Sequence, residues 1–438
     1  MSAPPEAAES SRARQQPEET SDDAPQRCRW VALGTLTGGP HRVGDERHRC
    51  ILSGRDLLLD LDDPPRASTL VLRANLTESY PAIFAADSSS ARLLVKGGSD
   101  RTNRPEYFLC DARARTAERL PDVPSSELGG LDLYPRRRIG LIADPDHTGH
   151  FMIAQLHPID TTRHDSILFY STATRRWATK QLASAPEHKR WSGHGVLAHD
   201  GLLWWVDVAY GMVVCNPFDD APHLRLVPLP DGCALQGVEM ERNSNGSRQT
   251  REFLDQRRFI RPSEGKLRYV EIRGFNYDTA AAAAEPPNDP TVRMWTLVDQ
   301  AGPNPTNTWE LEYEAPFAEI WAHDSYVAAG LPPDKVPNLA LVDPDNHGVA
   351  YFFHGTRLFG LDVRARRVVA CGDCVIGDTP IEMGGNLSSR FVEAWVPPEP
   401  GTCSQPARSF SVCADFSENI CAHSLTQTQL TITKGCLV

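Results

Sequence analysis

The chain has 438 residues and a formal net charge of −12, with 40% hydrophobic and 23% charged residues. This composition is typical of a globular protein that buries a core. The negative charge argues against a nucleic-acid partner, because affinity for phosphate backbones comes largely from Lys and Arg side chains that displace counterions. No apolar run approaches the length needed to cross a bilayer, so we expect no membrane anchor.

Residues 1–27 are rich in Pro, Ser, Glu and Ala and carry no pattern of a secretory signal peptide. They contain too little apolar surface to offset the entropy of ordering, so we expect a disordered leader. The absence of a signal sequence favours the cytoplasm or the nucleus, where the 11 cysteines would be free thiols.

Residues 28–398 repeat one theme, in which an apolar run of strand length is followed by a turn marked by Asp, Pro or Gly and then by another apolar run. The 35 prolines and 31 glycines are spread along the chain, which disfavours long helices. Strand pairs with a similar sequence pattern recur near Tyr107, Ile167, Met212, Met294 and Leu358. Repeats of about 50 residues with four strands each are typical of propeller blades. We predict an all-β, β-propeller-like domain of four-stranded blades, with six blades expected.

Two further segments resemble each other: "LIADPDHTGHFMIAQL" from Leu141 and "LALVDPDNHGVAYFFHG" from Leu339. Each places Asp-Pro-Asp and a glycine between apolar runs. A calcium loop would need oxygen ligands at alternate positions and a glutamate at the twelfth. The twelfth residues are Gln155 and His354, so we predict a tight strand-turn-strand instead.

The densest aromatic segment is "GLLWWVDVAYGMVVCNPFDD", Gly201 to Asp220, which we call the hairpin box. At strand period Trp204 and Trp205 face opposite ways, and "AYG" turns the chain. The box therefore predicts a β-hairpin in the middle of a blade, packed on both faces, and a ligand platform is the less favoured alternative. Its candidate residues, interpreted as structural, are Trp204, Trp205, Asp207, Gly211, Cys215, Pro217 and Phe218.

The hairpin box, the following "LRLVPLP", "EGKLRYVEI", "WTL" with "WELEYE", and the earlier "PPRASTLVLRANL" resemble a large grass-plant family, domain-of-unknown-function family 1618. The resemblance covers roughly Trp30 to Pro397. Members of that family commonly have Asp where this chain has Asn216. The resemblance implies a plant protein but no activity, cofactor or catalytic residue, because none is known for the family.

One basic segment stands apart from the acidic average, Arg248 to Arg268, with seven basic and three acidic residues. We expect a solvated hairpin edge here, since charge on an edge strand prevents aggregation.

Motifs for catalysis and metal binding are weak. The pair Cys371 and Cys374 lacks two further ligands at zinc-site spacing, and neither a nucleophile elbow nor a phosphate loop is present. "WSGHGVLAHDG" contains His194, His199 and Asp200, for which polar turn residues are the simpler interpretation. We expect no cofactor. The low-ranked candidates for an acid–base or metal site on the loop rim are His194, Asp200, His347 and His354.

Residues 399–438 contain four cysteines without strand rhythm, and we expect an irregular tail. Because propeller rims commonly bind proteins, the favoured hypothesis is a monomeric, non-enzymatic scaffold for an unknown protein or peptide partner. The alternative is an enzyme with an acid–base or metal site on the rim. A third possibility is a purely structural or pseudogene-like product, suggested by the tail.

Overall fold

The computed structural model describes residues 30–36, 54–73, 81–87, 89–98, 105–134, 138–158, 162–189, 191, 193–235, 246–275, 288–298, 307–376 and 387–398. These residues all lie in one compact unit, Met1–Glu399. The predicted leader, residues 1–27, and tail, residues 399–438, lie outside the described residues.

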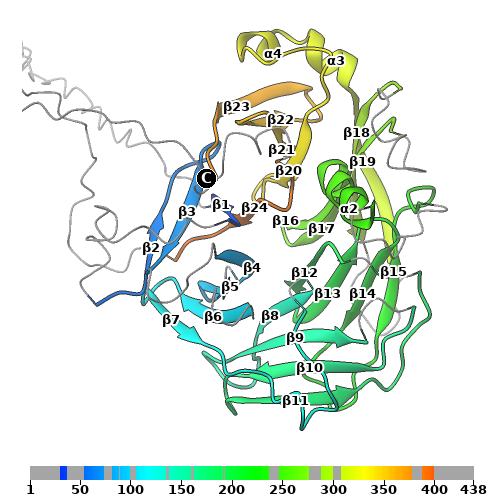
Figure 1. Ribbon diagram of the computed structural model, residues 1–438. Helices are drawn as coiled ribbons and strands as arrows, with labels where there is room; N and C mark the ends of the chain where they lie inside the picture. Colours follow the sequence, from blue (N-terminus) through cyan, green and yellow to red (C-terminus); the bar gives the residue numbers. More distant parts are fainter. Residues whose placement is uncertain are drawn as a thin grey trace, which may run out of the picture. The chain divides into compact units, whose positions relative to one another are not determined.

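Six four-stranded sheets form a ring, so the predicted six-bladed β-propeller is confirmed (Figure 1). The innermost strands of neighbouring blades contact one another around the central channel: β4 with β8, β8 with β12, β16 with β20, and β20 with β24. Each blade except the first is formed by four strands consecutive in the chain. The fold is therefore a set of local hairpins, as the repeated strand-turn-strand sequence requires.

Blades 2 to 4 follow this plain order from the channel outward. Blade 2 contains β4 (Ala82–Asp87), β5 (Arg92–Gly98), β6 (Pro105–Asp111) and β7 (Thr116–Arg119). Blade 3 contains β8 (Ile139–Ala143), β9 (Phe151–His157), β10 (Ser166–Ser171) and β11 (Arg176–Gln181). Blade 4 contains β12 (Gly195–His199), β13 (Leu202–Asp207), β14 (Gly211–Cys215) and β15 (Arg225–Pro228).

Blades 5 and 6 have the same order, whereas blade 1 combines both ends of the domain. Blade 5 contains β16 (Arg258–Ser263), β17 (Lys266–Arg273), β18 (Thr291–Val298) and β19 (Thr308–Pro316). Blade 6 contains β20 (Asn338–Val342), β21 (Val349–His354), β22 (Arg357–Asp362) and β23 (Arg367–Asp373). Blade 1 runs from β24 (Val392–Trp395) through β1 (Val31–Gly34) and β3 (Ala67–Leu72) to β2 (Leu57–Asp60).

The turn between the third and fourth strands repeats in blades 2, 3 and 6. Its last residue is an arginine with positive φ: Arg115 at 58°, Arg175 at 55° and Arg366 at 55°. In blade 2 the Asp111 carboxylate accepts hydrogen bonds from the backbone N–H groups of Arg113 and Ala114, at 2.9 and 2.8 Å. Such side-chain-to-backbone bonds fix the turn locally. Arg115, Arg175 and Arg366 are thus turn residues, and the backbone conformation of the turn positions them.

The ring closes between the two ends of the domain. β24 pairs antiparallel with β1, with Trp395 opposite Val31 and Val392 opposite Gly34. β1 in turn pairs with β3, and here the strands are parallel. Trp395 is fully buried in the cluster that joins blades 1 and 2. Closure therefore depends on residues as many as 364 positions apart in the sequence (395 − 31).

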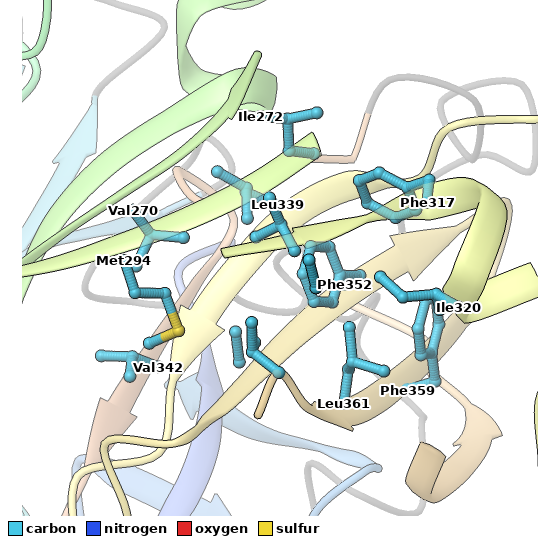
Figure 2. Packing of buried hydrophobic residues seen from close by; sticks show 14 of the residues in the cluster. Val270, Ile272, Met294, Phe317, Ile320, Leu339, Val342, Phe352, Phe359 and Leu361 are labelled. Carbon is cyan, nitrogen blue, oxygen red and sulfur yellow. The ribbon is translucent and has the colours of Figure 1, made fainter. Parts of the chain in front are cut away.

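Three helices were not expected from the sequence. α2 (Gly246–Arg257) leads into β16 and contacts β20, while α3 (Phe317–Ala322) and α4 (Asp324–Ala328) connect blades 5 and 6. Figure 2 shows Phe317 and Ile320 of α3 beside Phe352, Phe359 and Leu361 of blade 6, in the largest buried cluster. α3 and α4 thus supply apolar side chains to the core between two blades.

The expectation for Arg248 to Arg268 was wrong. The segment contains α2, β16 and the start of β17, and Arg257, Arg258 and Arg268 are buried. The Arg257 Nη1 donates to the Pro337 carbonyl at 2.7 Å, and the Arg258 Nη1 to the Cys233 carbonyl at 2.7 Å. Carbonyl acceptors allow the guanidinium groups to be buried, because each loses water but keeps hydrogen bonds.

We predict that Trp395→Ala lowers the free energy of unfolding by about 3–5 kcal/mol, because it removes a fully buried aromatic ring at the ring closure. Val396→Ala is the matched control, since Val396 is the next residue and is 39% exposed. Urea denaturation of both variants measures the difference. Equal stabilities would show that the closing strand is not held by this side chain.

Candidate functional site

The propeller has two ends, which we name by their loops. At the connector end the first strand of each blade begins, and at the hairpin end the first strand turns into the second. A small pocket lies at the connector end of the channel, where the starts of β4, β12 and β24 meet, and it opens to solvent. It is lined by Thr35, Ile83, Phe84, Gly195, Val196, Leu197, Arg261, Val392 and Glu393.

The exposed surface of the pocket wall is more polar than apolar, and two of its residues, Arg261 and Glu393, are charged. The Arg261 guanidinium is held in place because Nη1 donates to the Ile260 carbonyl at 3.1 Å and Nη2 to the Ser389 carbonyl at 3.4 Å. Thr35 donates its hydroxyl to the Arg390 carbonyl at 2.7 Å. The lining contains no histidine, cysteine or lysine, and Glu393 is its one carboxylate. Polar groups held in fixed positions are suited to orienting a bound group.

The hairpin box forms the two middle strands of blade 4, β13 and β14, as its pattern predicts. Trp204 faces the cluster shared with blade 5, and Trp205 the cluster shared with blade 3. Trp204 and Trp205 are 1% and 2% exposed, and their Nε1 groups donate to the carbonyls of His199 and Arg138, both at 3.2 Å. Both rings are therefore inside the sheet stack, and Trp205 is not presented on the rim.

The other box residues contact the scaffold. The Asp207 carboxylate accepts the Ala209 N–H at 3.0 Å, and Cys215 is buried. The carbonyls of Pro217 and Phe218 each accept a hydrogen bond from the Lys180 ammonium at 3.0 Å. Lys180 belongs to β11, so this ammonium joins the last strand of blade 3 to blade 4.

The four rim candidates do not converge. His194 and His354 lie at the connector end on blades 4 and 6, and Asp200 and His347 lie at the hairpin end on the same two blades. His194 is buried, with Nδ1 3.5 Å from the Asp207 carboxylate. Asp200 is an exposed turn residue with φ 51°. Burial is the main cause that lowers the pKa of His354, followed by the charge of Lys335.

His347 lies in a polar cluster between blades 5 and 6. Its Nδ1 is 2.5 Å from the Glu264 carboxylate, and its Nε2 is 3.1 Å from the Glu312 carboxylate and 3.0 Å from the Tyr313 hydroxyl. The Arg268 guanidinium also contacts Glu312, at 2.8 Å. Both ring nitrogens are engaged, so the imidazole offers no lone pair to a substrate. The cluster joins the two blades through the polar contacts of the imidazole.

Two turns of this end confirm the predicted Asp-Pro-Asp geometry. Asp144 accepts the backbone N–H groups of Asp146 and His147 at 3.0 and 3.1 Å, and Asp343 accepts those of Asp345 and Asn346 at 2.9 and 3.1 Å. The positive φ expected of the turn glycine occurs at Gly149 (83°) but not at Gly348.

The thiols of the described residues are poor nucleophiles. Cys110, Cys215, Cys233, Cys371 and Cys374 are free. Burial raises the pKa of Cys215, Cys233 and Cys374 to about 12, so the reactive thiolate is suppressed. Within the described ranges, no group of three or more His, Cys, Asp or Glu side chains has the arrangement of a metal site. In the same ranges no helix is long and apolar enough to span a membrane.

We predict that Gly211→Ala destabilises the protein by about 1–3 kcal/mol more than Gly201→Ala. Both glycines have positive φ, 152° and 72°. A Cβ at position 211 would lie 2.5 Å from the Val227 carbonyl oxygen, whereas at position 201 nothing lies within 4 Å. Thermal unfolding of the two variants compares them directly, and an equal loss would show that β14 and β15 can separate locally.

We also predict that Lys180→Met lowers the free energy of unfolding by about 1–3 kcal/mol, because three carbonyls lose a charged donor. Met keeps the aliphatic length of the side chain. Lys266→Met, at the exposed first residue of β17, is the control and should be neutral. Chemical denaturation checks the pair, and a neutral Lys180→Met would mean that water replaces the ammonium.

Comparison with known proteins adds a family match and distant structural likenesses. No curated protein matches the sequence. Solved structures similar to the chain include Kluyveromyces lactis Hsv2 (7% identity, TM-score 0.31, 67% of this chain and 64% of that chain). Others are a chain of a mitotic checkpoint complex (7%, 0.30, 66% and 62%) and the Myceliophteria thermophila Cps50 (Swd1) beta-propeller domain (9%, 0.31, 66% and 84%).

The chain thus spans less than two thirds of the length of the first two structures. At these TM-scores none of the likenesses supplies an argument for a function. Residues 205–351, from the second tryptophan of the hairpin box to β21, match the model of a family described as "Protein of unknown function (DUF1618)". This match supports, over that segment, the family resemblance seen in the sequence.

Proposed function

We propose that the protein is a non-enzymatic interaction scaffold that binds a protein or peptide partner at the connector end of its channel. The observation that carries the proposal is the pocket formed by the starts of β4, β12 and β24. Arg261 and Glu393 offer charges of opposite sign for orientation, and the apolar side chains Ile83, Leu197 and Val392 offer contacts to a small hydrophobic group. These features support a small recognition site.

The connector end also has the rigidity that binding requires. Ser389, just before β24, donates its hydroxyl to the Asp255 carbonyl at 2.7 Å, and Arg390 pairs with Glu252 of α2 at 2.9 Å. The loop that leads into the closing strand is therefore tied to α2. A preorganised site loses less conformational entropy when a partner binds.

The alternative of an acid–base enzyme has one observation in its favour, the cluster around His347. The imidazole there lies within 3.1 Å of each of two carboxylates. We favour the scaffold because that imidazole is already bonded at both nitrogens, and because the pocket has no nucleophile with a partner base. The proposal includes the finer expectations of a grass-plant origin, a cytoplasmic or nuclear location and a monomeric chain.

The test is an affinity pull-down from the source tissue with the intact chain and with Arg261→Glu. We expect capture of the partner to fall at least about tenfold in the variant, because the charge in the pocket is reversed. Arg366→Glu, at the hairpin end, is the matched control and should retain the partner. Unfolding curves of the three proteins verify that each is folded.

The captured partner is then purified and its affinity measured by titration calorimetry. Partners retained equally by wild type, Arg261→Glu and Arg366→Glu would place binding elsewhere and contradict the proposal. Loss with Glu393→Lys as well as with Arg261→Glu would define both charged residues as contacts.

A further inference from the structure

Three histidines meet at the connector end of blade 3. His157 ends β9, His164 lies in the loop between β9 and β10, and His188 lies in the connection from β11 to β12. The rings of His164 and His188 are 5.0 Å apart, and the ring of Trp191 is 5.2 Å from that of His188. The His188 backbone N–H donates to the Thr162 carbonyl at 2.8 Å, so the two loops are joined beside the imidazoles.

His157 and His164 are buried and His188 is half-buried, and the backbone orients the rings of His164 and His188. His157 and His164 are 2% and 3% exposed. The Nδ1 of His164 lies 3.0 Å from the Pro158 carbonyl, and the Nδ1 of His188 lies 2.7 Å from the Lys189 carbonyl. A carbonyl can only accept, so each Nδ1 carries the proton. The Nε2 atoms of all three rings are buried and have no hydrogen-bond partner among the described residues.

A proton added to this cluster would be poorly compensated. Burial lowers the pKa of His164 to about 4, helped by the neighbouring charges of His188, Arg138 and His157 and opposed by the Pro158 carbonyl. Burial also lowers the pKa of His157, although Asp165 and Asp132 act in the opposite direction. Asp132 and Asp165 are exposed, whereas Arg138 is 5% exposed and faces the cluster from the start of blade 3.

The cluster is connected to the pocket through a short stretch of chain. The Arg138 Nη2 donates to the Trp191 carbonyl at 3.3 Å, and the His194 backbone N–H donates to the Val206 carbonyl at 2.8 Å. His194 is followed directly by Gly195 and Val196, which line the pocket. His188 thus lies in the connection that leads into the pocket wall, and a movement of His188 would shift the residues of that wall.

We propose that His157, His164 and His188 form an acid-sensitive latch, which holds His188 against Thr162 while the imidazoles are neutral and releases it when His164 is protonated. Above about pH 6.5 both the closed and the opened latch are neutral, so the latch is at full strength. As the pH falls from about 6.5 towards about 4, only the opened form gains the proton, and opening becomes progressively easier.

The experiment is hydrogen exchange of the full chain, followed in peptides that contain the His188 amide and corrected for the intrinsic rate. Between about pH 7.5 and about pH 5 we expect the opening constant to rise roughly 30-fold, which follows from the two pKa values. In His164→Asn most of the response should be lost, and only the smaller part due to His157 should remain, since the Asn amide can still donate to the Pro158 carbonyl but takes up no proton.

His147→Asn is the control, because His147 is exposed at the hairpin end and should leave the response unchanged. If His164→Asn does not fold, His188→Asn decides the matter. It keeps a donor for the Lys189 carbonyl and removes a neighbour that lowers the pKa of His164, so its acid response should be smaller than in wild type. A wild-type response no larger than that of the Asn variants would overturn the latch.

Control of partner binding by the latch rests on the proposed function and has its own readout. Wild type should release the captured partner at about pH 5, and His164→Asn should retain it. If no partner depends on Arg261 at neutral pH, the proposed function fails, while hydrogen exchange still decides the latch. If wild type and His164→Asn release the partner equally, the connection from latch to pocket is wrong.

Discussion

The pairing of β24 with β1 is the interaction on which the architecture depends. Five blades are local meanders that each segment of chain can form alone, but a row of blades would leave the strands of blade 1 without their inner neighbour. The closing strand supplies that neighbour, with Trp395 opposite Val31. Trp30, next to β1, packs edge-on against Tyr351 of blade 6, so the closure also fixes the two terminal blades against each other.

Closure determines what the channel can hold. The first strands are drawn together so tightly that a Cβ on Gly140 of β8 would lie 2.7 Å from Val196 of β12. The inner strands β8 and β12 thus approach closely at this point, and the pocket lies at the starts of β4, β12 and β24. This position is consistent with the proposed binding at the connector end, because loops on a rigid scaffold commonly carry binding.

Much of the fold could be predicted because its units are local. The recurring positions Tyr107, Ile167, Met212, Met294 and Leu358 all lie in the third strand of a blade, in blades 2 to 6. Blade 1 gave no such repeat, since its strands come from distant segments and one pair is parallel. The repeat in the sequence therefore reports hairpins, and the closure leaves no local signal.

The helices and the buried arginines were missed for a related reason. α3 has only six residues, too few to establish a helical period, and its Phe317 and Ile320 are explained by the space between two blades. The charges of Arg257 and Arg258 suggested an exposed edge. Their guanidinium groups instead donate hydrogen bonds to the carbonyls of Pro337 and Cys233, which belong to other parts of the chain. Tertiary acceptors decide whether a charge is buried, and sequence does not show them.

The candidate sites illustrate the same limit and also separate the two ends chemically. His347 could be selected from the sequence, yet the carboxylates beside it come from another blade. His164 could not be selected, because its neighbours His157, His188 and Arg138 lie in three different segments of the chain. At the hairpin end the His347 imidazole lies between the carboxylates of Glu264 and Glu312. At the connector end a proton on His164 lies beside Arg138 and two more imidazoles. Burial and neighbouring positive groups thus oppose a proton at the connector end, where the pocket lies, whereas at the hairpin end the imidazole is held between carboxylates.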